Sequence, residues 1–223
     1  MRFHASVGLL LGLTVALSAQ TGQPPSADSV ARDLQKKYDR IADFSADFVH
    51  NYHGGVLRQQ ATEQGRLLVK KPGKMRWEYT SPEKKTFVSD GHKLYSYIPQ
   101  DKQVIVSSVP PDEDAPTPAL FLAGKGNLTR DFTHSLVDAP AGMPAGSRAL
   151  KLVPKASQRD YDWLVLVLDP GSLAIRGLLT MDAQGGTSTF FFTNLKENVG
   201  LADKAFTFTI PRGVDVVSAS SRH

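Results

Sequence analysis

The sequence predicts a mainly β protein, built on one large, curved antiparallel sheet or a partly open barrel. Segments in which apolar and polar residues alternate, the pattern typical of strands, follow one another through most of the chain. The turns between these segments are too short to hold crossover helices, so neighbouring strands must run antiparallel. Hydrophobic residues make up 41% and charged residues 22% of the 223 residues, which is ordinary for a packed globular chain.

The N-terminus has the three-part pattern of a secretory signal peptide. Arg2 is followed by an almost entirely apolar run over 7–17 and then by the small residues Ser18 and Ala19. That run is too short for a membrane-spanning helix, which needs about 20 apolar residues. We therefore expect export, with cleavage after Ser18 or Ala19. The predicted organisation is a signal peptide at 1–19, a flexible lead-in at 20–26, one domain at 27–217 and a C-terminal tail at 218–223.

An amphipathic helix is expected after the lead-in, and strands occupy most of the remaining chain. The helix can be capped by Ser26 or Asp28, and its apolar residues recur at helical spacing at positions Val30, Leu34, Tyr38 and Ile41. A short apolar segment at 119–123 is expected to form a helical turn. Roughly eleven or twelve strands are expected, at 44–52, 65–70, 74–79, 85–89, 93–98, 103–107, 132–137, 148–154, 162–169, 175–182, 188–195 and 206–210.

Two segments, at 163–168 and 190–192, are apolar on both parities, which is typical of strands buried on both faces. Because a single curved sheet leaves its concave face open, helices or a ligand must cover that face. The expected helix and the segment at 119–123 are the available covers. Two such lids over an apolar sheet would form a closable hydrophobic cavity, but the same pattern equally fits helices that complete a packed core.

The residue types exclude most catalytic chemistry. The chain has no cysteine, which removes disulfides, thiol chemistry, cysteine-bound zinc and acylation on cysteine. It has no G-x-S-x-G elbow and no phosphate-binding loop, and the spacing of His50 and His53 directs them to opposite faces of a strand. We therefore expect no enzyme, no metal and no cofactor. An enzyme acting on an apolar ligand through Asp160 and Asp162 is the alternative.

Basic residues concentrate in one stretch of a chain whose formal net charge is +4. Nucleic acid is not expected as a partner of an exported chain. A solvated basic face is the simplest interpretation, and an anionic membrane surface or an acidic partner protein is the alternative. The residues of this stretch are Arg66, Lys70, Lys71, Lys74, Arg76, Lys84 and Lys85.

Several segments, in a fixed order, are similar to those of a known protein family. They are FSADF at 44–48, GRLLVKKPGKMRWEY at 65–79, VSDG at 88–91, LYSYIP at 94–99, TPALFL at 117–122, LVPKA at 152–156 and AFTFTIPRGV at 205–214. Their order and spacing resemble those of the periplasmic outer-membrane lipoprotein carrier family, LolA, over nearly the whole mature chain.

The resemblance implies an incompletely closed antiparallel β-barrel of about 11 strands, covered by short α-helices that close a hydrophobic cavity. It implies a periplasmic monomer that carries acylated lipoproteins, with their acyl chains in the cavity. It implies two partners, an inner-membrane ATP-driven release complex that loads the carrier and an outer-membrane receptor that unloads it. That receptor is itself a lipoprotein, so the absence of cysteine selects the carrier. A periplasmic binder of another apolar ligand, such as a lipid, is the alternative.

The resemblance also implies site residues. In the family, a basic residue before the proline of the segment at 65–79 ties the sheet to the lid, and it usually is arginine. Here that position is Lys71, which we expect to be the lid latch. The residues expected to line the cavity, which could equally form a packed core, are Leu34, Tyr38, Phe44, Phe48, Met75, Trp77, Tyr79, Leu120, Leu122, Trp163, Val165 and Phe191.

Overall fold

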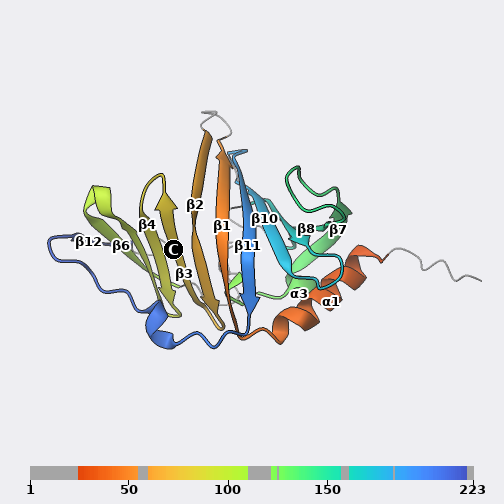
Figure 1. The fold of residues 1–223 in the computed structure, drawn as a ribbon, viewed down its shortest axis with the longest axis horizontal. Coiled ribbons are helices and arrows are strands. Elements are labelled where there is room, and N and C mark those ends of the chain that lie inside the picture. Colours follow the sequence, from red (N-terminus) through yellow and green to blue (C-terminus); the bar gives the residue numbers. More distant parts are fainter. Residues whose placement is uncertain are drawn as a thin grey trace, which may run out of the picture.

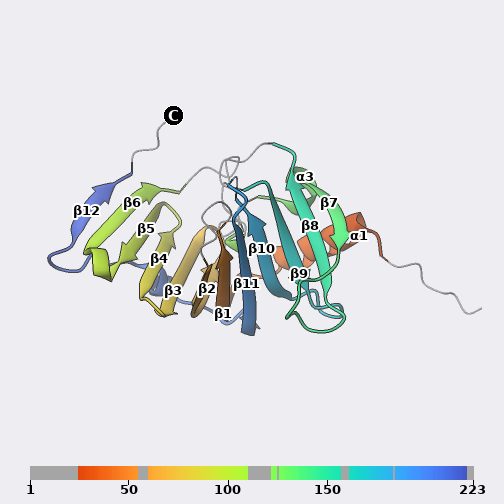
Figure 2. The ribbon, with the colours of Figure 1, turned by 90° about the horizontal axis from the view of Figure 1, so that it is seen from above.

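The structure is a computed structural model that describes residues 25–54, 60–109, 122–124, 126–156, 161–182 and 184–219. Twelve strands form one sheet in the order β12-β6-β5-β4-β3-β2-β1-β11-β10-β9-β8-β7. Within this part of the chain its two end strands, β12 and β7, do not pair with each other, and the sheet bends into an open half-barrel (Figures 1 and 2). The expected fold class, a mainly β and incompletely closed barrel, is confirmed.

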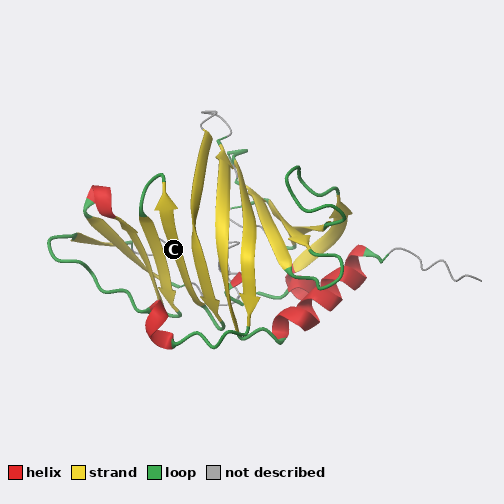
Figure 3. Cartoon of the chain, in the orientation of Figure 1, coloured by secondary structure: helices red, strands yellow, loops and turns green. Residues whose placement is uncertain are grey.

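Strands make up the bulk of the molecule, and the helices lie at its periphery (Figure 3). The helical elements are α1 (Ala27–Asp39), η1 (Pro99–Asp101), α3 (Leu128–Asp131) and η3 (Asp203–Phe206). The strands are β1 (Asp43–His53), β2 (Gln60–Lys70), β3 (Lys74–Ser81), β4 (Lys85–Asp90), β5 (Lys93–Ile98), β6 (Gln103–Ser108), β7 (Phe132–Val137), β8 (Arg148–Pro154), β9 (Trp163–Leu168), β10 (Ile175–Met181), β11 (Thr187–Glu197) and β12 (Asp215–Ser218).

The helix α1 lies on the concave side of the sheet, against the half that ends in β8 and β7 (Figure 2). Ser26, and not Asp28, caps the helix, because its side chain accepts a hydrogen bond from the Ser29 N–H at 3.2 Å. The apolar residues Val30, Leu34 and Tyr38 are all buried against the sheet. The helix predicted from their spacing is confirmed.

Neighbouring strands run antiparallel except β6 and β12, which are parallel. The expected strand at 206–210 was wrong. Phe206 ends η3, and residues 198–214 form a C-terminal strap that runs from β11 to the far edge of the sheet (Figure 1). Phe208 of the strap packs on the outer face of the sheet, where its ring lies 5.4 Å from that of Tyr95.

The sheet is buried on both faces around β8, β9 and β10, as the two-sided apolar pattern of 163–168 predicts for β9. On the concave face these strands pack against α1 in the main core. On the outer face Ala149 and Val165 form a second, small cluster, which Ala139 and Met143 cover from the loop between β7 and β8. A loop rather than a helix therefore covers the outer face.

Candidate ligand-binding site

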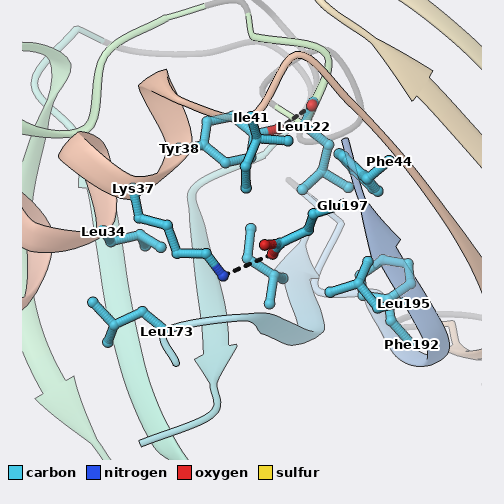
Figure 4. A pocket seen from close by; sticks show the side chains of 11 residues that line it. Leu34, Lys37, Tyr38, Ile41, Phe44, Leu122, Leu173, Phe192, Leu195 and Glu197 are labelled. Carbon is cyan, nitrogen blue, oxygen red and sulfur yellow. Dashed lines mark hydrogen bonds and ion pairs between the residues drawn. The ribbon is translucent and has the colours of Figure 1, made fainter. Parts of the chain in front are cut away.

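The helix α1 closes an apolar pocket on the concave face (Figure 4). The free volume is about 20 Å³, which is room for about one water molecule. Side chains from α1, β1, β11 and the loop before β10 occupy the rest of the interior. The lining residues are Leu34, Lys37, Tyr38, Ile41, Phe44, Leu122, Leu173, Ile175, Phe192, Leu195 and Glu197. The arrangement is therefore a closed one, in which the helix packs directly on the sheet.

Beyond this pocket the concave face continues as an aromatic wall, formed by Phe48, Trp77, Tyr79 and Phe190. The centre of the Phe48 ring lies 5.1 Å from that of Trp77 and 4.9 Å from that of Tyr79. The Trp77 ring lies 5.2 Å from that of Phe190. Gly65 of β2 makes these contacts possible, because a Cβ there would lie 2.6 Å from Cζ of Phe48. The absence of a side chain at Gly65 therefore leaves space for the rings from β1, β3 and β11 to contact one another.

Lys71 lies where α1, the turn after β2 and the segment at 122–124 meet. Its Nζ donates a hydrogen bond to the carbonyl oxygen of Tyr38 and lies 4.3 Å from the centre of the Tyr38 ring. The Tyr38 hydroxyl in turn donates to the carbonyl oxygen of Leu122. Gly124 leaves space for the lysine, since a Cβ there would lie 2.5 Å from Cδ of Lys71. Lys71 therefore joins the sheet to the C-terminal end of α1.

Burial sets the proton equilibria at this junction. It lowers the pKa of Lys71, and the charge of Asp39 opposes that shift. It raises the pKa of the Tyr38 phenol, and the negative charge of Glu197 acts in the same direction. The phenol therefore stays protonated and donates to Leu122 at neutral pH.

A second polar contact between helix and sheet was missed by the sequence analysis. Nζ of Lys37 lies 2.7 Å from Oε1 of Glu197, and this ion pair spans the pocket (Figure 4). Two signals could have found it. Lys37 follows Leu34 by three residues and so borders the apolar face of α1, and Glu197 shares its strand face with Leu195. Each signal places one residue beside an apolar face, but neither indicates that the two residues contact each other.

The structure brings most of the expected cavity residues together. Leu34, Tyr38, Phe44 and Leu122 line the pocket. The others in the main core or packed against it are Phe48, Met75, Trp77 and Tyr79. Leu120 lies outside the described residues.

Three expected cavity residues instead lie on the outer face. Val165 and Trp163 belong to the small cluster beside Ala139 and Met143. Phe191 lies next to Gly142, where an added Cβ would lie 3.3 Å from the Phe191 ring. The reason is strand alternation, since the sequence neighbours of these residues point to the concave face. These strands are apolar on both faces, so their sequence did not indicate which parity faces α1.

The basic stretch is mostly paired within the chain. Lys70 and Lys74 lie 2.6 Å and 2.9 Å from the carboxylate oxygens of Asp203 in η3. These lysines hold the pKa of Asp203 at about 2, well below its ordinary value. Arg76 lies 2.6 Å from Glu78. These residues fasten the strap to the sheet more than they form an open basic face.

The histidines and acids do not gather. Among the residues that the structure describes, no three His, Asp or Glu side chains are grouped as metal ligands would be. In the same part of the chain, no helix has the length and apolarity needed to cross a membrane. Asp160, half of the carboxylate pair considered for catalysis, lies outside the described residues.

The molecule is an open half-barrel with an apolar concave face under a helix, a geometry typical of sites for apolar ligands. A family model described as outer membrane lipoprotein carrier protein LolA matches residues 39–209. Because this match spans most of the chain, the protein belongs to the LolA family.

Individual relatives agree with this assignment. The chain is 32% identical to an outer-membrane lipoprotein carrier protein of Chromohalobacter salexigens, over 97% of this chain and 96% of the relative. It is 31% identical to a protein of the same description from Methylococcus capsulatus, over 82% of this chain and 85% of the relative. A solved structure of an uncharacterized conserved protein from Thermus thermophilus shares the fold, with a TM-score of 0.52 and 12% identity over 85% of this chain and 99% of that one.

Proposed function

We propose that this protein is a periplasmic carrier that shields the acyl chains of lipoproteins on their way to the outer membrane. Family membership supports this function, and the lidded concave face is the observation that carries it. Burial of an acyl chain gains about 0.8 kcal/mol per CH₂. A lipoprotein therefore leaves a membrane only when an equally dry site accepts its chains. The pocket and the aromatic wall would form such a site.

Loading requires α1 to move. The closed pocket has a free volume of about 20 Å³, which is room for about one water molecule. No acyl chain fits in this pocket beside the side chains that line it. A helix that packs on the empty face competes with cargo, and this competition makes binding reversible.

Lys71 is the proposed latch of this lid. Arginine would offer a planar fork of donors, whereas lysine offers one ammonium group, which here reaches the Tyr38 carbonyl oxygen. We expect Lys71→Leu to impair lid closure and to slow cargo transfer, because it removes the donor but keeps an apolar stem. Lys71→Arg is the matched control and should retain transfer. Unchanged transfer rates in Lys71→Leu would contradict the latch.

Two membrane partners complete the proposed cycle. The first is an inner-membrane, ATP-driven complex that releases lipoproteins to the carrier, and the second is an outer-membrane receptor that accepts them. The sequence contains no phosphate-binding loop and no cysteine. The partners would therefore supply both the energy of ATP and the lipid-anchored acceptor, while the carrier travels as a monomer.

Reconstitution tests this function directly. Inner-membrane vesicles that hold the release complex and a radiolabelled lipoprotein are mixed with ATP and the exported chain. We expect the lipoprotein to appear in the supernatant in complex with the carrier, and failure to release it would overturn the proposal. Purification from native periplasm gives a second test. Acylated lipoproteins in the purified protein would support a carrier, and free lipid alone would support the alternative binder.

A further inference from the structure

Two polar atoms on the concave face are buried without a hydrogen-bond partner among the described residues. They are Nε1 of Trp77 and Nε2 of His50, and Trp77 is only 4% exposed. Buried polar groups are almost always paired in native proteins, so each unpaired one needs an explanation. Both side chains contact Phe190 of the aromatic wall. Their partner is therefore to be sought in what binds against that wall.

A carboxylate orients His50. Its Nδ1 lies 3.3 Å from Oε2 of Glu63, and Lys85 donates to the other oxygen of the same carboxylate. Because a carboxylate only accepts, Nδ1 carries the proton, and Nε2 of the neutral ring presents a lone pair. Burial lowers the pKa of His50, with Glu63 opposing and Lys85 reinforcing this shift, which favours the neutral ring.

The His50 ring is also held in place by packing. It stacks on Phe190 with ring centres 4.1 Å apart and an angle of 5° between the planes. Glu63 is itself buried, at 9% exposure, and holds its position through Lys85. An acceptor at Nε2 is therefore fixed at the aromatic wall before any ligand arrives.

Trp77 supplies the complementary group. Its indole N–H can only donate, and its ring is held edge-on by Phe48 and Phe190 at 5.1 Å and 5.2 Å between ring centres. Since Phe190 touches both Trp77 and His50, one donor and one acceptor occupy the same part of an otherwise apolar wall.

We propose that Trp77 and His50 form a recognition site for an acyl amide. The amide oxygen accepts a hydrogen bond from Nε1 of Trp77, and the amide N–H donates to Nε2 of His50. An ester satisfies only the tryptophan, and a plain hydrocarbon satisfies neither group. The inference rests on the proposed function, since it names the chemical group that the site recognises at the head of a bound acyl chain.

Nuclear magnetic resonance of the wild-type protein tests the donor without any substitution. The chain has two tryptophans, and Trp163 lies on the outer face, so its indole signal is an internal control. The probes are N-methyldodecanamide, methyl dodecanoate and dodecane. We expect the amide and the ester, but not dodecane, to shift the Trp77 indole N–H signal downfield, while the Trp163 signal stays in place.

Displacement of the dye N-phenyl-1-naphthylamine measures affinity for the same three probes. Loss of one neutral hydrogen bond weakens binding about fivefold. Trp77→Phe should therefore weaken amide and ester binding by that factor more than it weakens dodecane binding. His50→Phe should weaken amide binding by that factor more than it weakens ester or dodecane binding. Tyr97→Phe, on the outer face beside Phe208, is the matched control and should change none of them. Melting temperatures show whether each variant is folded. If a variant is unfolded, the nuclear magnetic resonance spectra of the wild type decide whether the amide site exists.

The outcomes separate this site from the carrier function. Equal amide affinities of wild type and Trp77→Phe, or a Trp77 signal that does not move at saturation, would overturn the amide site and leave the carrier standing. A wild type that binds none of the probes would overturn the site together with the apolar cavity. Normal amide binding with failed lipoprotein release would support the site and count against the carrier.

Discussion

Gly65 determines how closely the rings of the aromatic wall can approach the sheet. A Cβ at this position would lie 2.1 Å from the Glu78 carbonyl oxygen and 2.6 Å from Cζ of Phe48. We expect Gly65→Ala to destabilise the fold by about 1–3 kcal/mol, as overpacking of a core does. Urea unfolding measures the change. Gly171→Ala, whose Cβ would meet Asp169 at an ordinary 3.7 Å, is the control; equal midpoints for the two variants would contradict this explanation.

Asp43 is a buried carboxylate that joins β1 to the start of the strap. It is 4% exposed, and its carboxylate accepts the backbone N–H groups of Val199, Gly200 and Leu201 at 2.7–3.1 Å. It thereby fastens the start of the strap to β1.

Asp43→Asn should lose about 1.5–3 kcal/mol of unfolding free energy, because charge-assisted hydrogen bonds are replaced by weaker ones and one amide NH₂ faces backbone donors. The measurement is again urea unfolding. Asp33→Asn is the control, since Asp33 is exposed on α1 and lies 3.6 Å from Lys36. A loss at position 43 no larger than that at position 33 would show that the strap does not depend on the carboxylate.

At the scale of elements, α1 and the strap are attached by different interactions. The helix packs its apolar face on the sheet and adds separate polar contacts, among them Lys37 with Glu197, Gln35 with the N–H of Leu128, and Asp28 with His134. The strap is fastened by charged groups, with Lys70 and Lys74 on Asp203. The proposed loading step requires α1 to leave its site, which needs separable contacts, whereas it does not require the strap to move.

Glu197→Gln should shift the lid toward the open state. The variant keeps the shape of the side chain and removes the charge that faces Lys37, so we expect apparent affinity for N-phenyl-1-naphthylamine to rise about two- to fivefold, because a larger fraction of molecules is open. Lys36→Met, on the exposed side of α1, should leave dye affinity unchanged. Weaker dye binding in Glu197→Gln would contradict a role of this pair in closing the lid.

The strap should loosen in acid. Its Asp203 has a folded-state pKa of about 2, below the ordinary 3.8, because Lys70 and Lys74 bond the charged form. The stabilisation is therefore complete above the ordinary pKa and is lost as the pH falls from 3.8 toward 2. We expect the difference in urea midpoint between wild type and Asp203→Asn to shrink across this window. A difference that stays constant down to pH 2 would mean that the ion pairs do not hold the strap.

For the whole molecule, the proposed function requires two arrangements of the same fold, and the structure has the closed one. The chain contains no cysteine, so an introduced pair is unique. Lys37→Cys with Glu197→Cys, joined by a short dimaleimide linker that contains a cleavable disulfide, would tie α1 to β11. We expect lipoprotein release to fall at least about tenfold when the linker is intact and to recover after reduction. Release that continues in the cross-linked protein would exclude movement of α1 as the loading step.

Much of the architecture could be predicted because it depends on local pattern. The apolar spacing of Val30, Leu34 and Tyr38 identified α1, and short turns identified an antiparallel sheet. The strap was not recognised, because Phe206 and Phe208 alternate as strand residues do while Phe208 packs on the outer face. Alternation indicates that residues share a face. It does not indicate whether the backbone pairs with a neighbouring strand.

The amino-acid sequence alone was enough to specify a mainly β chain, its amphipathic helix and its membership of a family, because periodicity and ordered motifs are properties of the chain itself. Only the folded molecule assigned the two faces of each strand. Val165 and Phe191 lie outside and Phe190 and Phe192 inside, because the side that meets α1 depends on the direction in which the whole sheet curves. Contacts such as Lys37 with Glu197 join residues far apart in the chain, and no local pattern contains them.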